Sequence, residues 1–504
     1  MRQTSSAVRQ PVNIVGSSTY GRYPKVSSEV TYNMYESDSW LLSFSGYKRV
    51  LQLLSSNTGQ GRGLFHSVRA NCIIAVVNSS VFRIDAGLIV TPLGNLNTSS
   101  GEVYMDENLA NQICIVDGLN AYIYNHSGAP FLTVQTLTSG AINPGYVTYI
   151  NTYFVFGNAD VSSAGSQWSV YLPDGSDPNL ITFQQTLSLQ TKPDYAIAVK
   201  RIPGQSSNVL VFGTSVCEIW TQTASAGLRL FSKNQSVNID YGCLSVATIA
   251  SCDQYIAWLG INESNAPVIT VFSNQGASQI STDGINHTLS SLKYPAESTA
   301  TFYRKDGHLF YQLTFYNPAD NITFVYDFET QKFYNLSDGQ LNHHPAIDVV
   351  YFNQQSYFLS LNNTSLYALS TDFTTFDENI SGSNPDLIAE IPRIRVCEPI
   401  RHPDASQFRA NGVYMMIEQG YDSQYVGLNQ NSATLNYVPR IDLAISADSG
   451  VTWSNYVSRD MQPEGFRQNM MTWEKLGAFN DLTLKFRFNG LSHFCVNQAH
   501  CDIF

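Results

Sequence analysis

The apolar residues of this chain recur in short alternating runs that are separated by clusters of Gly, Asn, Asp, Ser and Thr. The stretch Val209–Trp220, VLVFGTSVCEIW, shows the unit, in which two apolar runs flank the break Gly213-Thr214-Ser215. Alternation with period two places apolar side chains on one face of a strand, and a short break containing glycine is typical of a hairpin turn. The stretch therefore predicts a strand, a tight turn and a second strand.

The same unit recurs along most of the chain, for example in Gln112–Val116 and Ala121–Tyr124, which flank the turn sequence Asp117-Gly118. The spacing from Cys72 to Cys114 fits the roughly 40–50 residues of one propeller blade. Between residues 46 and 375 we count six or seven such units. The pattern predicts an all-β fold with a β-propeller-like body of six or seven blades.

The two ends of the chain read differently from this body. Residues 1–45 are polar without a long periodic segment, and we interpret them as an N-terminal arm that closes the ring or reaches a neighbouring subunit. Residues 376–392 are interpreted as a linker. Residues 393–504 are predicted to form a C-terminal β-sandwich, because their apolar runs alternate as in half-exposed strands. Its expected strands are Val413–Glu418, Arg440–Ser446 and Leu482–Phe488.

Charge changes the picture of the surface. The chain of 504 residues carries 28 Lys and Arg against 40 Asp and Glu, a net charge of −12, and only 13% of its residues are charged. Typical soluble chains have about 25%. Neutral, aromatic-rich surfaces suit permanent contacts, and an acidic balance disfavours a broad nucleic-acid-binding face. An acidic surface can nevertheless line a DNA channel, because repulsion keeps the polymer from sticking.

Basic residues gather in two places. Lys192, Lys200 and Arg201 flank one expected blade, and Arg393, Arg395 and Arg401 open the C-terminal region. The second group is our candidate for residues that face an acidic partner or DNA. A solvated surface is the alternative interpretation of both groups.

We expect neither a cofactor nor a metal. Most of the eight cysteines lie in apolar runs, which predicts buried reduced thiols. Cys495 and Cys501, beside His493 and His500, form a cluster whose spacing matches no common zinc site. The N-terminus lacks the apolar segment of a signal peptide, and no apolar run reaches the ~18 residues of a membrane helix. We therefore expect synthesis in a cytoplasm and no membrane segment.

The most specific local match is Ser446-x-Asp448-x-Gly450-x-Thr452-Trp453, the Asp-box pattern of sialidases and other propellers. The residues predict a structural hairpin, in which Asp and Ser hold the turn, Gly takes a positive φ and Trp453 is buried beneath. A sialidase would also need several boxes, an arginine cluster and a Tyr/Glu pair. A metal or acid–base site could be built from His343, His344 and Asp348. A surface loop is the interpretation we favour for these residues. We therefore predict that the chain is not an enzyme.

Several stretches, in order, resemble one family. These are Leu42–Gly46 with Lys48-Arg49, Arg62–Leu64, Val209–Trp220, Phe324–Asp327, Thr472–Gly477 and Leu484–Arg487. Together they resemble packaged-DNA stabilisation proteins, which form the tail hub of short-tailed bacteriophages. Ser45 stands where that family would have proline.

This resemblance implies a structural virion protein that is assembled in the host cytoplasm. It implies a ring of identical subunits, six in number, beneath the portal and its adaptor ring. The ring would hold tail spikes or fibres, be plugged by a needle, and enclose double-stranded DNA without reading its sequence. It would thus close the DNA channel and stabilise packaged DNA. Two alternatives stay open, namely a carbohydrate-active propeller (sialidase-like or lectin) and a bacterial propeller scaffold without a virus.

Overall fold

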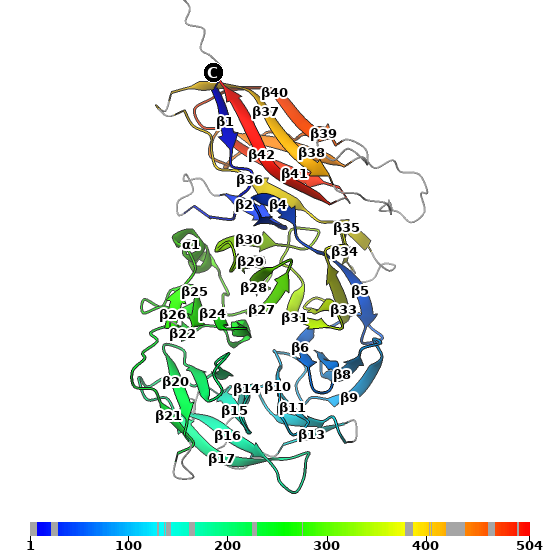
Figure 1. Ribbon diagram of the computed structural model, residues 1–504, viewed down its shortest axis with the longest axis vertical. Helices are drawn as coiled ribbons and strands as arrows, with labels where there is room; N and C mark the ends of the chain where they lie inside the picture. The colour runs from blue at the N-terminus through cyan, green and yellow to red at the C-terminus, as the bar shows by residue number, and fades with distance from the viewer. Residues whose placement is uncertain are drawn as a thin grey trace, which may run out of the picture.

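The computed structural model of the protein is nearly all β, as the strands and sheets in Figure 1 show. The structure describes residues 8–21, 29–128, 131–135, 137, 143–160, 167–223, 229–274, 276–378, 387–402, 404, 406–419, 439–461, 469–490 and 493–504. The part of the expected linker from 379 to 386 lies outside these residues. Within them there is one α-helix, α1 (Asp283–Ser291), which begins after Thr282, whose side chain accepts a hydrogen bond from Ile285 N. No described helix has the length and apolar character needed to cross a membrane.

Seven four-stranded units follow one another around a ring, which fixes the blade number at seven (Figure 1). In the first four units and the sixth, antiparallel neighbours are consecutive in the chain. The first four blades are β6 (Gly61–Ser67), β7 (Cys72–Val77), β8 (Ser80–Asp85) and β9 (Val90–Asn95); β10 (Tyr104–Glu107), β11 (Gln112–Val116), β12 (Ala121–Asn125) and β13 (Leu132–Val134); β14 (Pro144–Ile150), β15 (Tyr153–Asn158), β16 (Gln167–Pro173) and β17 (Ile181–Ser188); β18 (Ala198–Arg201), β19 (Asn208–Phe212), β20 (Cys217–Gln222) and β21 (Phe231–Lys233).

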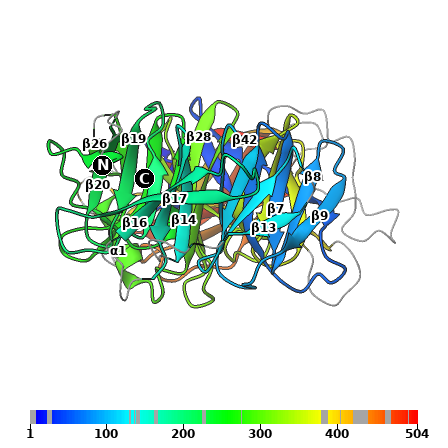
Figure 2. The ribbon, with the colours of Figure 1, turned by 90° about the horizontal axis from the view of Figure 1, so that it is seen from below.

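The last three blades complete the ring, and Figure 2 shows the blades side by side from below. The fifth blade has a short extra strand, β23, on β24. These blades are β22 (Gly242–Cys243), β23 (Ala250–Cys252), β24 (Tyr255–Ile261), β25 (Pro267–Ser273) and β26 (Gly276–Gln279); β27 (Ser298–Lys305), β28 (His308–Phe315), β29 (Ile322–Asp327) and β30 (Lys332–Leu336); β31 (Ala346–Phe352), β32 (Gln355–Ser360), β33 (Ser365–Ser370) and β5 (Gly46–Gln52).

The ring is closed by a strand from near the start of the chain. β5 pairs with β33, for example Tyr47 with Leu369, and supplies the outermost strand of the seventh blade. Tyr47 is buried and stacks on Phe376, with ring centroids 4.3 Å apart. Because the first and last parts of the propeller share one sheet, opening the ring would expose this aromatic core.

Short polar side chains hold the hairpin turns. In Val209–Trp220 the turn after β19 is held by Asp194, whose carboxylate accepts hydrogen bonds from the backbone N–H groups of Thr214, Ser215 and Val216 at 2.7 to 3.1 Å. Asp117 does the same for Leu119 and Asn120. Since Asp, Asn and Ser satisfy turn N–H groups locally, a chain of many hairpins is rich in them.

The C-terminal unit lies beside the sixth and seventh blades (Figure 1). One of its sheets has β3 (Met34–Ser37), β4 (Trp40–Ser43), β42 (Phe494–Ile503), β37 (Phe408–Gln419) and β40 (Asn469–Phe479), with β1 (Val8–Val12) also on β42. The other continues from β30 through β2 (Val30–Tyr32), β36 (Arg393–Val396), β41 (Thr483–Asn489) and β38 (Arg440–Ser446) to β39 (Val457–Asp460). Side chains of both sheets share one core, which includes Val413, Trp473, Leu443 and Phe486.

The described strands of the N-terminal segment belong to this unit, so for them the prediction of a separate arm over residues 1–45 was wrong. β1 pairs with β42, β3 and β4 extend the same sheet, and β2 lies between β30 and β36. Within and beside the expected linker, β34 (Thr375–Glu378) pairs with β35 (Leu387–Glu390) and with β5. The N-terminal segment thereby ties the propeller to the C-terminal unit.

Candidate functional site

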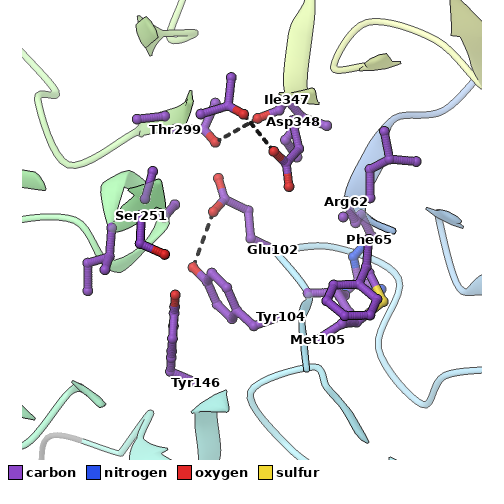
Figure 3. Close-up of a pocket in the computed structure, with 18 of the residues that line it drawn as sticks. Arg62, Phe65, Glu102, Tyr104, Met105, Tyr146, Ser251, Thr299, Ile347 and Asp348 are labelled. Atoms are coloured by element: carbon purple, nitrogen blue, oxygen red, sulfur yellow. Dashed lines mark hydrogen bonds between the residues drawn. The ribbon is translucent and has the colours of Figure 1, made fainter. Parts of the chain in front are cut away.

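A cavity of about 260 Å³ lies on the propeller axis, where the inner strands of the blades converge. Its polar lining combines carboxyl and phenol groups with the cations Lys200 and Arg62. Figure 3 shows Glu102, Tyr104, Tyr146 and Asp348 pointing into it. The Tyr104 hydroxyl donates to Glu102 Oε2 at 3.2 Å. A DNA duplex, whose major groove alone is about 12 Å wide, cannot enter so small a space.

The carboxyl groups of this cavity bind protons more readily than exposed ones. Burial raises the pKa of Glu102 to about 8 and that of Asp348 to about 6. Thr301 Oγ1 donates to Asp348 Oδ1 at 2.7 Å, which partly offsets the effect on Asp348. Removal from water penalises the charged form of a carboxyl group, so the axis favours neutral acids. Among the described residues, no group of three His, Cys, Asp or Glu is placed to hold a metal ion.

The Asp-box residues form a closed hydrogen-bonded turn between β38 and β39. Ser446 Oγ donates to Asp448 Oδ1 at 2.6 Å, and the same carboxylate accepts from Thr452 N at 2.8 Å and Thr452 Oγ1 at 2.6 Å. These bonds hold the pKa of Asp448 down at about 2. Gly450 has φ +89°, where a side chain would be strained. Every polar group named here is hydrogen-bonded within the turn.

The prediction that Trp453 is buried beneath this turn was wrong. Its ring is half-buried on the outside of the sheet, against Gly450 and under the ammonium of Lys485, which lies 5.2 Å from the ring centroid. The buried tryptophan of this unit is Trp473, whose Nε1 donates to the Val457 carbonyl at 2.9 Å. The alternation in the C-terminal strands also predicts a core of Leu443, Leu484, Phe486 and Phe488, and these four do lie there, with Ile445 at its margin.

Two of the three candidate partner-facing arginines are buried, so that interpretation was wrong for Arg393 and Arg395. Their registers place them opposite Phe488 and Phe486, on the core side of β36. Arg393 donates to Ser43 Oγ at 2.7 Å and to the Gly490 carbonyl at 2.8 Å. Arg401 is exposed and pairs with Asp481 at 2.6 Å. The three side chains do not form one basic surface.

Arg395 holds the N-terminal segment in place. Its guanidinium donates to three carbonyl groups and to Thr31 Oγ1, and it forms an ion pair with Glu29. The three carbonyl groups belong to Asn13, Ile14 and Ser17. Gly16 lies so close to the guanidinium that an added Cβ would collide with it. A donor-saturated, fully buried arginine of this kind has no group left for DNA.

A second polar contact joins the N-terminal hairpin to the sixth blade. His308 lies 2.9 Å from Asp327 Oδ2 through Nδ1 and 3.1 Å from Ser37 Oγ through Nε2. This connectivity is that of a nucleophilic triad. Asp327 is also bound by Glu329 N at 3.0 Å and by Thr330 Oγ1 at 2.7 Å, in the turn after β29. The imidazole is packed against aromatic rings, so we interpret the contact as a structural joint.

The two adjacent histidines do not form a site with Asp348. His344 is buried, which lowers its pKa to about 3, whereas His343 is hydrogen-bonded to Asn321. The expectation of a surface loop was therefore wrong for His344. Sequence reasoning missed Glu102 and Tyr104, which carry no motif. The only feature that could have indicated them is the Glu–x–Tyr spacing at the start of an inner strand. Residues two apart on a strand point to the same side, so both side chains can face the axis.

The fold is a seven-bladed propeller joined to a two-sheet unit, and the comparisons place it in a family. The family model described as bacteriophage P22 Gp10, β-propeller, matches residues 21–374. Because this match covers well over half of the 504 residues, the chain belongs to this family of phage stabilisation proteins. It is thus a structural protein of the phage head-completion and stabilisation class, as the sequence resemblance indicated. No curated protein matches the chain.

Solved propellers match at very low identity. A streptogramin B lyase is 9% identical with TM-score 0.42, over 64% of this chain and 97% of that one. A virginiamycin B lyase from Staphylococcus aureus is 10% identical with TM-score 0.44, over 64% and 99%. The WD40 propeller domain of Doa1 is 10% identical with TM-score 0.39, over 65% and 97%. At these values no functional inference follows from them.

Proposed function

We propose that this protein is a tail hub that joins the portal's adaptor ring to tail spikes or fibres and to a needle or plug. In this role six copies form a ring that closes the DNA channel and keeps the packaged genome inside. The observation that carries the proposal is family membership over residues 21–374. Assembly takes place in the host cytoplasm, and the DNA is enclosed without sequence-specific contacts.

The architecture supports this role. A propeller whose ring is closed by β5 and whose N-terminal strands also belong to the C-terminal unit can transmit force as one body. The chain has few charges and many neutral polar residues, which suits permanent contacts with other proteins. Its own axis is too narrow for DNA, so the proposed channel lies at the centre of the subunit ring.

Mass photometry of the purified chain, with and without the portal's adaptor ring, tests the proposal. We expect a mass increase of six subunits on the adaptor ring. The experiment would contradict the hub if the chain stayed unbound at concentrations at which hub components assemble. A glycan-binding array and a sialoside hydrolysis assay test the carbohydrate alternative in parallel, and saturable glycan binding or turnover would favour it.

A further inference from the structure

The propeller has two faces, which Figure 2 shows edge-on, and the turns between its strands are divided between them. Because neighbouring strands of a blade are antiparallel, the turn after the first strand and the turn after the third strand lie on the same face. In the first blade these turns are residues 68–71 and 86–89. In the second blade they are residues 108–111 and a longer turn that ends at Phe131, and in the seventh blade the first turn is Asn353-Gln354.

The most exposed apolar side chains of the protein gather at these turns. Among the described residues, seven large apolar side chains are at least 60% exposed, and five of them lie in these turns or within two residues of them. We call this group the tip face, and it consists of Val68, Ile89, Leu109, Phe131 and Tyr351. The turns after the first strand in the fourth, fifth and sixth blades carry no side chain of this kind. Single exposed apolar side chains are normal, whereas a group of them on adjacent blades indicates a contact surface.

Contacts between the blades hold the turns of the tip face in position. The Glu107 carboxylate of the second blade accepts a hydrogen bond from Val68 N of the first blade at 3.1 Å. Between the seventh and first blades, the rings of Phe352 and His66 are in contact, with centroids 5.3 Å apart. Turns that are already ordered lose little conformational entropy on binding. The tip face is thus preorganised for a partner.

The tip face carries no excess charge. Its turns and the strand residues that adjoin them contain three charged residues, namely Arg69, Asp85 and Glu107. Arg69 Nη2 donates to Asn111 Oδ1 at 3.0 Å, and Asp85 pairs with Arg83 at 2.8 Å. Glu107 is bonded to the neighbouring turn. Since positive and negative charges are balanced and already have partners, apolar burial is the main attraction that this face can offer.

The charge of the propeller behind this face restricts what can cover it. Residues 46–392 contain 14 Lys and Arg against 26 Asp and Glu. DNA and anionic lipid would be repelled by this body, and the tip face offers them no cluster of cations. A second copy bound at the same face would bring two acidic propellers together. A different protein, with an apolar contact surface and a neutral or basic charge, fits both the apolar side chains and the acidic body behind them.

We propose that the tip face is the surface by which this chain binds a different protein of the phage particle, through an apolar contact surface of neutral or basic charge. The inference rests on the proposed function, because the partner belongs to the particle. It places the contact on the first, second and seventh blades, on the face that carries the turns after their first and third strands.

The test compares two matched double variants of the full chain. Val68→Ser/Leu109→Ser, the tip variant, removes two apolar side chains from the tip face. Leu119→Ser/Leu341→Ser makes the same kind of change at turns of the opposite face, where Leu119 is 53% and Leu341 is 44% exposed. Each protein is added in a concentration series to particles of the parent phage that lack the chain, and the bound protein is measured after the particles are sedimented. Thermal unfolding checks that each variant is folded.

We expect the unaltered chain and the control variant to saturate the particles at the same concentration. The tip variant should need a concentration about tenfold higher, as expected when exposed anchors of an interface are truncated. If the tip variant bound as well as the unaltered chain, or if both variants were weakened equally, the inference would be overturned and the hub would stand. If the unaltered chain did not bind the particles at all, the hub would fail and the inference with it.

Cross-linking in assembled particles identifies what covers the face. Tyr351 is replaced by the photoreactive amino acid p-benzoylphenylalanine, the particles are irradiated, and the cross-linked peptides are identified by mass spectrometry. We expect peptides of a particle protein other than this chain. Peptides of a second copy would overturn the inference. So would flotation of the free chain with vesicles of phosphatidylcholine and phosphatidylglycerol if the tip variant lost it, because the face would then bind lipid.

Discussion

Arg395 Nη2 donates a hydrogen bond to the carbonyl oxygen of Asn13 at 2.8 Å, across 382 residues of sequence. The bond is one of several by which the fully buried guanidinium holds the N-terminal segment against β36. The beginning of the chain is therefore part of the C-terminal unit. Its detachment would leave the buried guanidinium without its hydrogen-bond acceptors.

Replacement of this arginine should destabilise the C-terminal unit. In Arg395→Met the buried Ile14 carbonyl loses its guanidinium donor and the Glu29 carboxylate loses its ion-pair partner. Removal of one partner of a buried ion pair costs about 3–5 kcal/mol. Urea unfolding followed by tryptophan fluorescence measures the change in free energy of unfolding.

The control for this variant is Arg401→Met. Arg401 pairs with Asp481 at the surface, where such pairs contribute at most about 1 kcal/mol. A similar loss of stability in both variants would show that Arg395 does not hold the segment.

The two tryptophans of the C-terminal unit should respond differently to truncation. Trp473 is buried among core side chains and its indole N–H is bonded to Val457, so Trp473→Ala should cost about 3–5 kcal/mol. Trp453 lies half-buried on the outside of the sheet, so Trp453→Ala should cost about 1 kcal/mol, close to the value of its cation–π contact. Thermal unfolding of the two variants compares them directly, and the reverse order would place the wrong tryptophan in the core.

Glu102 should make propeller stability depend on pH. Its folded-state pKa of about 8 lies above the ordinary value near ~4.3, because burial disfavours the carboxylate. The stability it provides is fully present below the ordinary pKa and is lost as the pH rises through 8. Glu102→Gln keeps a neutral side chain at every pH. The variant should therefore melt like the unaltered chain at pH 5 and at a higher temperature at pH 9.

Glu263→Gln, at an exposed acid of the fifth blade's loop, is the matched control and should leave the melting temperature unchanged at both pH values. If Glu102→Gln gave no advantage at pH 9, the Glu102 carboxyl would be solvated and the axial cavity would be open to bulk water.

The hairpins and the propeller could be predicted from sequence because both are local. Alternation with period two and a turn cluster such as Gly213–Ser215 specify a strand pair without reference to distant residues. The apolar runs of β7 and β11 each fall inside one blade, so their spacing predicted the repeat. The sequence could not decide between six and seven blades. That decision depends on the pairing of β5 with β33, which joins residues more than 300 positions apart.

The errors came from contacts that no local pattern encodes. The short polar strands of the N-terminal segment find partners such as β42 near the other end of the chain, so they look like an unstructured arm. Arg393 and Arg395 alternate with Ile394 as exposed cations would, but a covering segment with carbonyl acceptors makes their burial possible. In the Asp box, the turn residues predicted the hydrogen bonds, whereas the side of the sheet that Trp453 covers depends on its surroundings.

Retention of DNA by packaged phage particles tests the central claim most directly. Particles of the parent phage packaged without this chain are purified, the purified chain is added to one half, and the DNase-resistant genome is measured in both halves. If the chain is a hub protein, particles that lack it lose their DNA, and added chain binds the portal vertex and restores DNA retention. Equal retention in both halves, with the chain bound or unbound, would contradict the account.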